Sequence, residues 1–166
     1  MNNMSEDNVP KEVLEARRKL PKFDDGRINY TDAEKAPVVV IFMKYENEIL
    51  IMKRSQNVGT HPGKWGLVAG YLDELKSVIG KGLEEISEET GIEEDKIEVM
   101  ERKGKLKWFS DEAETTYISY ILLVKLNDKP EIKLSWEHED YKWIDIEEAD
   151  KYLSPNAVKE LKIALS

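Results

Sequence analysis

Cysteine is absent from the sequence. Its absence excludes disulfide bonds, zinc sites built on thiolates and cysteine nucleophiles, and therefore several classes of enzyme. Long apolar segments are missing too, since the longest run, residues 37–43, is far shorter than the roughly 20 residues of a membrane-spanning helix. The N-terminal segment also lacks the apolar core of a signal peptide. We therefore expect a cytoplasmic protein without a membrane partner.

Basic residues are outnumbered by acidic ones. The 166 residues include 25 Lys and Arg against 34 Asp and Glu, and the formal net charge at pH 7 is -9. A nucleic-acid-binding face needs clustered Lys and Arg to contact phosphates, so we expect no nucleic-acid partner. The same acidity favours a cation site built from carboxylates.

The apolar residues suffice for one packed core, because 40% of the chain is hydrophobic and a domain of this size buries roughly 70% of its unfolded surface. The length fits a single domain with a short extension. We divide the chain into an N-terminal extension with a short helix, residues 1–34, and a main domain, residues 35–166. The extension is also a candidate segment for forming a homodimer.

Hydrophobic patterning predicts strands on both sides of one central helix. Residues 37–43 and 48–52 are β-branched and apolar, so we expect two adjacent strands joined by a turn. Residues 55–70 have the Gly-rich composition of a loop. The central helix is expected over residues 77–90, with Gly91 placed to end it in a left-handed conformation.

Gly80 and Gly82 disfavour this helix, because each costs roughly 1 kcal/mol relative to alanine inside a helix. The remaining elements are further strands and terminal helices. The strands are expected at 96–101, 104–109, 116–126 and 141–146, and the helices at 10–20, 147–153 and 155–165. The pattern predicts a layered domain of mixed α/β class.

Three glutamates, Glu85, Glu88 and Glu89, share one face of the central helix. At about 100° per residue, Glu88 lies roughly 60° to one side of Glu85 and Glu89 roughly 40° to the other. Like charges at this spacing destabilise a bare helix, and the helix dipole near a C-terminus favours positive charge instead. A divalent cation would replace the repulsion with coordination. The alternative is an ordinary solvated face in a highly charged chain.

The residues around these glutamates resemble the motif of the Nudix hydrolase family, G-x5-E-x7-R-E-U-x-E-E-x-G-U, in which U is aliphatic. The matching positions are Gly70, Glu85, Ile86, Glu88, Glu89, Gly91 and Ile92. The resemblance extends from about residue 26 to residue 166. It implies the Nudix fold, a mixed β-sheet sandwiched between helices (α/β/α).

Two residues depart from the motif. Lys76 stands in place of its first glutamate, and Glu84 stands in place of its arginine. Because the two substitutions are of opposite sign, we hypothesise that they form an ion pair of reversed polarity that braces the loop against the helix. The alternative is a member of the family that has lost turnover and only binds a nucleotide.

The resemblance implies a Nudix pyrophosphohydrolase that hydrolyses a nucleoside diphosphate linked to another moiety, with Mg²⁺ or Mn²⁺ as cofactor. It assigns Glu85, Glu88 and Glu89 as metal ligands, with Glu85 and Glu89 as the alternatives for the base that activates water. Glu137 is expected as a fourth ligand from outside the helix. Its rivals are Glu112, Glu114 and Glu139.

Four residues are candidates for contacting the substrate. Arg54, at the end of the second strand, presents a guanidinium suited to a phosphate. Gly70 has no side chain to obstruct a close approach of the backbone to metal and phosphate. Trp108 and Phe109 are candidates for stacking on a base, since they lie where dinucleoside polyphosphate members of the family tend to carry a tyrosine.

Other substrates of the family fit less well. The ADP-ribose members carry a proline beyond the motif, but no proline occurs between Pro62 and Pro130. Coenzyme A remains an alternative, although Gly59 stands where those members have an arginine. The isopentenyl diphosphate isomerases use a catalytic cysteine, which this chain lacks.

Overall fold

A computed structural model describes residues 8–59 and 61–166. Seven strands form one mixed β-sheet, and helices cover it on both sides. The strands are β1 (Lys35–Tyr45), β2 (Glu48–Arg54), β3 (Trp65–Gly66), β4 (Val68–Tyr71), β5 (Ile97–Ser110), β6 (Thr115–Leu126) and β7 (His138–Asp145). The α-helices are α1 (Lys11–Lys19), α2 (Val78–Thr90) and α3 (Pro155–Leu165), and the short 3-10 helices are η2 (Glu94–Lys96) and η3 (Ile146–Lys151).

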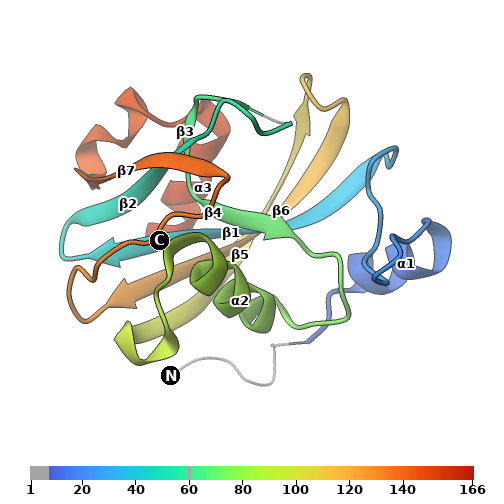
Figure 1. Cartoon of the computed structure of the whole chain (residues 1–166), viewed down its shortest axis with the longest axis horizontal. Helices are drawn as coiled ribbons and strands as arrows, with labels where there is room; N and C mark the ends of the chain where they lie inside the picture. The colour runs from blue at the N-terminus through green and yellow to red at the C-terminus, as the bar shows by residue number, and fades with distance from the viewer. Residues whose placement is uncertain (1–7, 60) are drawn as a thin grey trace.

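Strand β1 organises the sheet (Figure 1). The strand order is β3-β2-β1-β6-β5, with β4 paired to β1 and β7 paired to β2. β1 runs parallel to β6 along ten paired positions, from Lys35 opposite Thr116 to Lys44 opposite Lys125. It runs antiparallel to β4 along residues 38–41, near its middle, and to β2 at its end. This arrangement places the end of β4 next to the central strand and beside helix α2.

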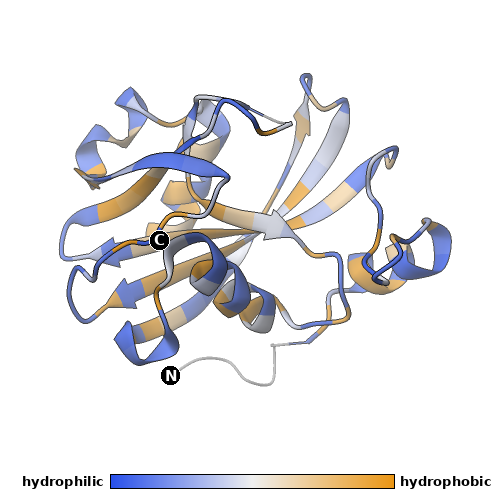
Figure 2. Ribbon diagram, in the orientation of Figure 1, coloured by the Kyte–Doolittle hydropathy of each residue, from blue (hydrophilic) through white to orange (hydrophobic). Residues whose placement is uncertain are grey.

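Side chains of β1 alternate between two hydrophobic clusters. Val39 and Ile41 belong to the cluster on the α2 face, whereas Val40 and Phe42 belong to the cluster on the α3 face. The period of two residues is the alternation expected of a strand that is covered on both sides. Figure 2 shows the central strands mainly in the hydrophobic colour, with mixed colours on the helices. The predicted fold, a mixed sheet between helices, is confirmed.

Helix α2 has the expected ends. The Ser77 hydroxyl accepts a hydrogen bond from the Gly80 N–H at 3.0 Å, and Gly91 ends the helix with φ 74°. Gly82 has a packing reason, because an added Cβ would lie 2.6 Å from Cδ1 of Leu122 on β6. The glycine that disfavours the helix by propensity therefore allows α2 to pack closely on the sheet.

Two predictions for local structure are wrong. The predicted loop over 55–70 contains β3 and β4, because its end pairs with β2 and β1. The strands expected at 96–101 and 104–109 form one strand, β5, whose pairing shifts between Arg102 and Gly104. The helix expected at 147–153 is present as the 3-10 helix η3, which covers Ile146–Lys151.

The N-terminal residues pack against the main domain. Val13 of α1 is fully buried in the cluster on the α2 face, and the Tyr120 hydroxyl donates a hydrogen bond to the Glu12 carboxylate. The next residue of α1, Leu14, is 48% exposed. β1 begins at Lys35, and the division at residues 34 and 35 stays a prediction. Among the described helices, none has the length and apolar character needed to span a membrane.

Candidate active site

Two of the three helix glutamates meet at a buried position. The carboxyl groups of Glu85 and Glu89 are joined by a hydrogen bond, and Glu89 is only 4% exposed. We call these two residues the carboxyl pair. Glu88, on the same helix, is exposed, and its negative charge raises the pKa of Glu85. The helix thus carries the buried Glu89 and the half-buried Glu85, with the solvated carboxylate of Glu88 beside them.

The environment of the carboxyl pair favours the protonated form. Burial raises the pKa of Glu85, and burial raises the pKa of Glu89 well above its ordinary value. The interaction between the two carboxyl groups raises the pKa of Glu89 and lowers that of Glu85. The charge of Glu137 raises the pKa of both groups. A bound divalent cation would take the place of this proton.

His138, the first residue of β7, lies beside the carboxyl pair. Its Nε2 is 3.8 Å from Oε1 of Glu89, and its side chain is buried. Burial, together with the charge of Arg54, lowers the pKa of His138 to about 4. The imidazole is therefore neutral at pH 7, and its contact with Glu89 is not an ion pair.

Gly70, on β4, faces the carboxyl pair across a very short gap. A Cβ at this position would lie 2.5 Å from Cδ of Glu85 and 2.6 Å from its Oε1. Such a contact is far inside van der Waals distance, so any side chain would displace the Glu85 carboxylate. Gly70 thus makes room for Glu85 itself, which refines the expectation that it makes room for the substrate.

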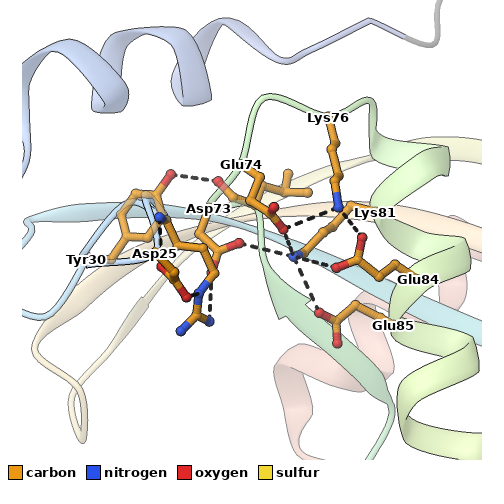
Figure 3. A network of polar contacts seen from close by, with 10 residues as sticks. Asp25, Tyr30, Asp73, Glu74, Lys76, Lys81, Glu84 and Glu85 are labelled. Carbon is orange, nitrogen blue, oxygen red and sulfur yellow. Dashed lines mark hydrogen bonds and ion pairs between the residues drawn. The ribbon is translucent and has the colours of Figure 1, made fainter. Parts of the chain in front are cut away.

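Lys76 and Glu84 form the ion pair hypothesised from the sequence. The Lys76 ammonium donates a hydrogen bond to Oε2 of Glu84, and it lies 3.4 Å from Oε1 of Glu74. Figure 3 shows Lys76 reaching from the loop before α2 toward Glu84 on the helix. The two departures from the motif therefore compensate each other, and the loop is tied to the helix with reversed polarity.

Lys81 lies at the centre of the same network (Figure 3). The residue is only 5% exposed, and four carboxylates surround its ammonium. The distances from Nζ are 3.1 Å to Asp73, 2.9 Å to Glu74, 3.5 Å to Glu84 and 3.8 Å to Glu85. These carboxylates outweigh the cost of burial, so the pKa of Lys81 is raised and the residue is charged. Lys81 thus links the loop network to the carboxyl pair.

A cavity of about 410 Å³ has Gly70 among its lining residues. We call it the aromatic cavity. Its lining comprises Val38, Val40, Arg54, Val58, Gly59, His61, Ala69, Gly70, Tyr71, Trp108, Tyr117, Ser119, Trp136, Glu137 and Glu160. The volume lies in the range of pockets that bind small molecules, about 300–1,000 Å³. Gly70 and Glu137 connect the cavity to the carboxyl pair, since both are close to it and both line the cavity.

Aromatic rings form one wall of this cavity. The ring centroids of Trp108 and Tyr117 are 5.1 Å apart, and those of Tyr117 and Tyr71 are 6.3 Å apart. Tyr30 stacks on Tyr71 behind the wall, at 5.6 Å. Trp136 lies at the rim, where it is 73% exposed. Aromatic faces at such a wall suit a planar base.

The structure brings together most of the residues chosen from the sequence. Arg54, Gly70, Trp108 and Glu137 all line the aromatic cavity. Phe109 is not among the lining residues and is 58% exposed.

The rivals of Glu137 are not among the residues that line the cavity. Glu112 pairs with His61, while Glu114 and Glu139 are exposed. The main chain of Glu137 is held in place, because its carbonyl accepts a hydrogen bond from the Ser55 N–H at 2.8 Å.

Sequence reasoning missed Lys81 and four residues of the cavity. Tyr71, Tyr117, Ser119 and Glu160 come from three separate elements, and strand pairing together with the packing of α3 on the sheet gathers them. A signal existed for Lys81, because it precedes Glu84 and Glu85 by three and four residues, the spacing of helical ion pairs.

The donor set of the site suits a divalent cation. All candidate ligands offer carboxylate oxygens, which hard cations prefer, and the buried Oε2 of Glu89 has no hydrogen-bond partner within residues 8–59 and 61–166. In that same part of the chain, no three acidic or histidine side chains are gathered closely enough to hold a metal ion as they stand. The residues therefore fit a cation by their chemistry, with the exposed Glu88 lying apart from the pair.

Comparison with known proteins identifies the family. The NUDIX domain matches residues 34–163. A bis(5'-nucleosyl)-tetraphosphatase [asymmetrical] from Mus musculus is 31% identical over 119 residues, which cover 71% of this chain and 76% of that protein. The chain therefore belongs to the NUDIX family.

Solved structures show the same fold. A MutT protein from Methanosarcina mazei Go1 has a TM-score of 0.64 and 24% identity, and the match covers 80% of this chain and 92% of that chain. An Ap4A hydrolase from C. elegans, solved as a binary complex, has a TM-score of 0.62 and 22% identity, with 79% and 94% covered.

The predicted enzyme class, a Nudix pyrophosphohydrolase, is confirmed by the family and by the tetraphosphatase relative. Nudix hydrolases act on nucleotide derivatives and generally use divalent metal ions.

Proposed function

We propose that this chain hydrolyses a pyrophosphate bond in dinucleoside polyphosphates, or in related nucleotides joined to another group, and that it needs Mg²⁺ or Mn²⁺. The observation that carries the proposal is the contiguity of the buried carboxyl pair with the aromatic cavity through Gly70 and Glu137. The carboxyl pair, where phosphate hydrolysis would occur, thus lies next to the aromatic cavity, which would bind the base. The tetraphosphatase relative favours diadenosine tetraphosphate as the first substrate to test.

Glu85, Glu88 and Glu89 would hold the cation, with Glu137 as a fourth ligand from outside the helix. The bound cation would neutralise phosphate oxygens and acidify a water molecule. One member of the carboxyl pair would orient the attacking water and accept its proton. The base stays open between Glu85 and Glu89.

The remaining residues bind and orient the substrate. The Arg54 guanidinium contacts a phosphate, and its place in the cavity lining supports that role. Trp108 stacks on a base, since it forms part of the aromatic wall. Phe109 lies outside the cavity lining and would contact the part of a long substrate that extends beyond the cavity. The oxygen of water joins one phosphorus, and the bridging oxygen leaves with the other phosphate.

The Lys76–Glu84 pair favours an enzyme over an inactive binding domain. The two departures from the motif were the reason to consider a chain that has lost turnover. Because they form an ion pair with each other, the tie between loop and helix is kept. The glutamates Glu85, Glu88 and Glu89 are unchanged from the motif.

The test is product release from a substrate panel. The panel contains diadenosine tetraphosphate, nucleoside triphosphates, nucleotide sugars, ADP-ribose and coenzyme A, each with Mg²⁺ or Mn²⁺. We expect the fastest hydrolysis with diadenosine tetraphosphate, which yields AMP and ATP, and loss of that activity in Glu88→Gln.

Glu147→Gln is the matched control, because it makes the same chemical change at an exposed position of η3. It should retain the wild-type rate. A silent panel, combined with nucleotide-induced thermal stabilisation, would replace the proposal with a nucleotide-binding domain.

A further inference from the structure

Glu160, on α3, lies at the floor of the aromatic cavity. The residue is 4% exposed, yet it belongs to the cavity lining together with Val38, Val40 and Ser119. No part of the hydrolytic mechanism uses it, since the carboxyl pair lies on α2. A buried acid with apolar neighbours is costly unless it has hydrogen-bond partners.

One of its two oxygens has such a partner. The Trp108 Nε1–H donates to Oγ of Ser119 at 3.0 Å, and the Ser119 hydroxyl donates to the Glu160 carboxylate. The other oxygen, Oε2, has no hydrogen-bond partner within the described parts of the chain. An indole and a hydroxyl thus hold the carboxyl group in place, and Oε2 remains as an acceptor with nothing to accept from.

The chemistry of the cavity restricts what can satisfy Oε2. Burial raises the pKa of Glu160 to about 7, so the group is partly ionised at neutral pH and repels a phosphate. The rings of Tyr71, Tyr117 and Trp108 present flat faces beside it. A planar group that carries an N–H at its edge fits both features, and in a nucleotide that group is the base.

We propose that Glu160 selects the base of the substrate, with Oε2 accepting a hydrogen bond from an exocyclic amino group such as that of adenine. This inference rests on the proposed function, because it takes a nucleotide as the occupant of the cavity. Ser119 positions the carboxyl group, and the aromatic wall stacks on the base. Bases without an amino group leave Oε2 unpaired and bind less tightly.

The experiment compares AMP with purine riboside 5'-monophosphate, which differs only by lacking the amino group. Dissociation constants are measured by calorimetry in the presence of Mg²⁺, so no turnover is needed. We expect wild type to prefer AMP about tenfold, the size expected of one hydrogen bond to a charged group. The preference is a ratio within one protein, so a change in stability does not alter it. Equal affinity for the two ligands would overturn the proposal.

Glu160→Met keeps the length of the side chain and removes the acceptor. Its preference for AMP should fall to about onefold, while the exposed control Glu147→Gln should keep the wild-type ratio. An unchanged ratio in Glu160→Met would contradict the assignment. If this variant does not fold, the comparison of ligands on wild type still decides.

The two proposals fail in different ways. Absence of hydrolysis with every substrate of the panel would overturn the proposed function. The ratio of the dissociation constants for AMP and purine riboside 5'-monophosphate would still test the role of Glu160. Hydrolysis that proceeds equally well with adenine and with the amino-free purine would retain the proposed function and remove the role of Glu160.

Discussion

A single buried ammonium, that of Lys81, neutralises carboxylates from two segments of the chain. Asp73 and Glu74 belong to the loop before α2, whereas Glu84 and Glu85 belong to the helix. Without Lys81, Asp73 would be a buried acid whose remaining cation is Arg27, at 3.6 Å. Removing one partner from a buried charge network leaves the others uncompensated, which costs more than the network gains.

Lys81→Met should therefore destabilise the fold by about 3 kcal/mol, since the loss of a buried partner typically costs about 3–5 kcal/mol and two of these carboxylates are partly solvated. Urea denaturation measures the change in the free energy of unfolding. Lys162→Met, at an exposed position of α3, is the control and should change it by less than about 0.5 kcal/mol. A loss below about 1 kcal/mol in Lys81→Met would refute the central place of this ammonium.

Gly70→Ala tests the fit between β4 and the carboxyl pair. The added methyl would lie 2.5 Å from Cδ of Glu85, so we expect the Glu85 carboxylate to move and kcat to fall about tenfold or more. Gly66→Ala is the control, because a Cβ at Gly66 meets no atom within 4 Å. The kcat values of the two variants and of wild type are measured by steady-state kinetics with diadenosine tetraphosphate. Wild-type kcat in Gly70→Ala would show that Glu85 tolerates displacement.

Glu160 also predicts a dependence of stability on pH. The native carboxyl has a pKa of about 7 against an ordinary value of 4.5, so between these pH values the folded chain holds a proton that the unfolded chain has released. The free energy of unfolding therefore falls as pH rises through this window. Glu160→Gln removes this contribution.

As the pH rises from 4.5 to 7, the free energy of unfolding of Glu160→Gln should increase relative to that of wild type by up to about 3 kcal/mol, since one pKa unit corresponds to about 1.4 kcal/mol. Urea denaturation at pH 5 and pH 8, without ligand, measures the difference. Glu147→Gln should show no comparable trend. If the free energies of unfolding of Glu160→Gln and wild type differed by the same amount at both pH values, this would argue against a raised pKa of Glu160.

At the scale of elements, one ion pair ties the loop before α2 to the helix. Lys76 and Glu84 are 41% and 30% exposed, so solvent screens their attraction. A double-mutant cycle with Lys76→Ala and Glu84→Ala should give a coupling energy of about 0.5–1 kcal/mol that shrinks in 1 M salt. Lys76→Ala with Glu147→Ala is the control cycle and should be additive. Additivity in the first cycle would rule out the pair as a brace.

The sequence predicts elements well where one residue decides their ends. Ser77 and Gly91 bound α2, and Ser154 with Pro155 starts α3, as expected from capping preferences. The sequence-based prediction fails where pairing with a segment distant in the chain decides whether a strand forms. The segment that contains β4 has loop composition and becomes a strand only because β1 offers its hydrogen bonds. The strands expected at 96–101 and 104–109 form one strand, because β6 pairs with β5 on both sides of the gap predicted between them.

At the scale of the molecule, the sheet assembles the site. The spacing within α2 sufficed to choose Glu85, Glu88 and Glu89, because helical geometry fixes their relation. The aromatic cavity was not foreseeable, since Tyr117 and Ser119 reach it through the parallel pairing of β6 with β1, and Glu160 through the packing of α3. Local patterns predict residues that one element carries, and tertiary pairing supplies the rest.

The most direct test of the account is the rate of AMP release from diadenosine tetraphosphate as Mg²⁺ is titrated into metal-free protein. We predict no turnover without the cation, saturable turnover with it, and a rate at least about 100-fold lower in Glu88→Gln, since even indirect partners of a metal site cost about 10–100-fold. Glu147→Gln should follow wild type. Turnover that is independent of Mg²⁺ and Mn²⁺, or unaffected by Glu88→Gln, would contradict the claim that these glutamates hold a catalytic cation.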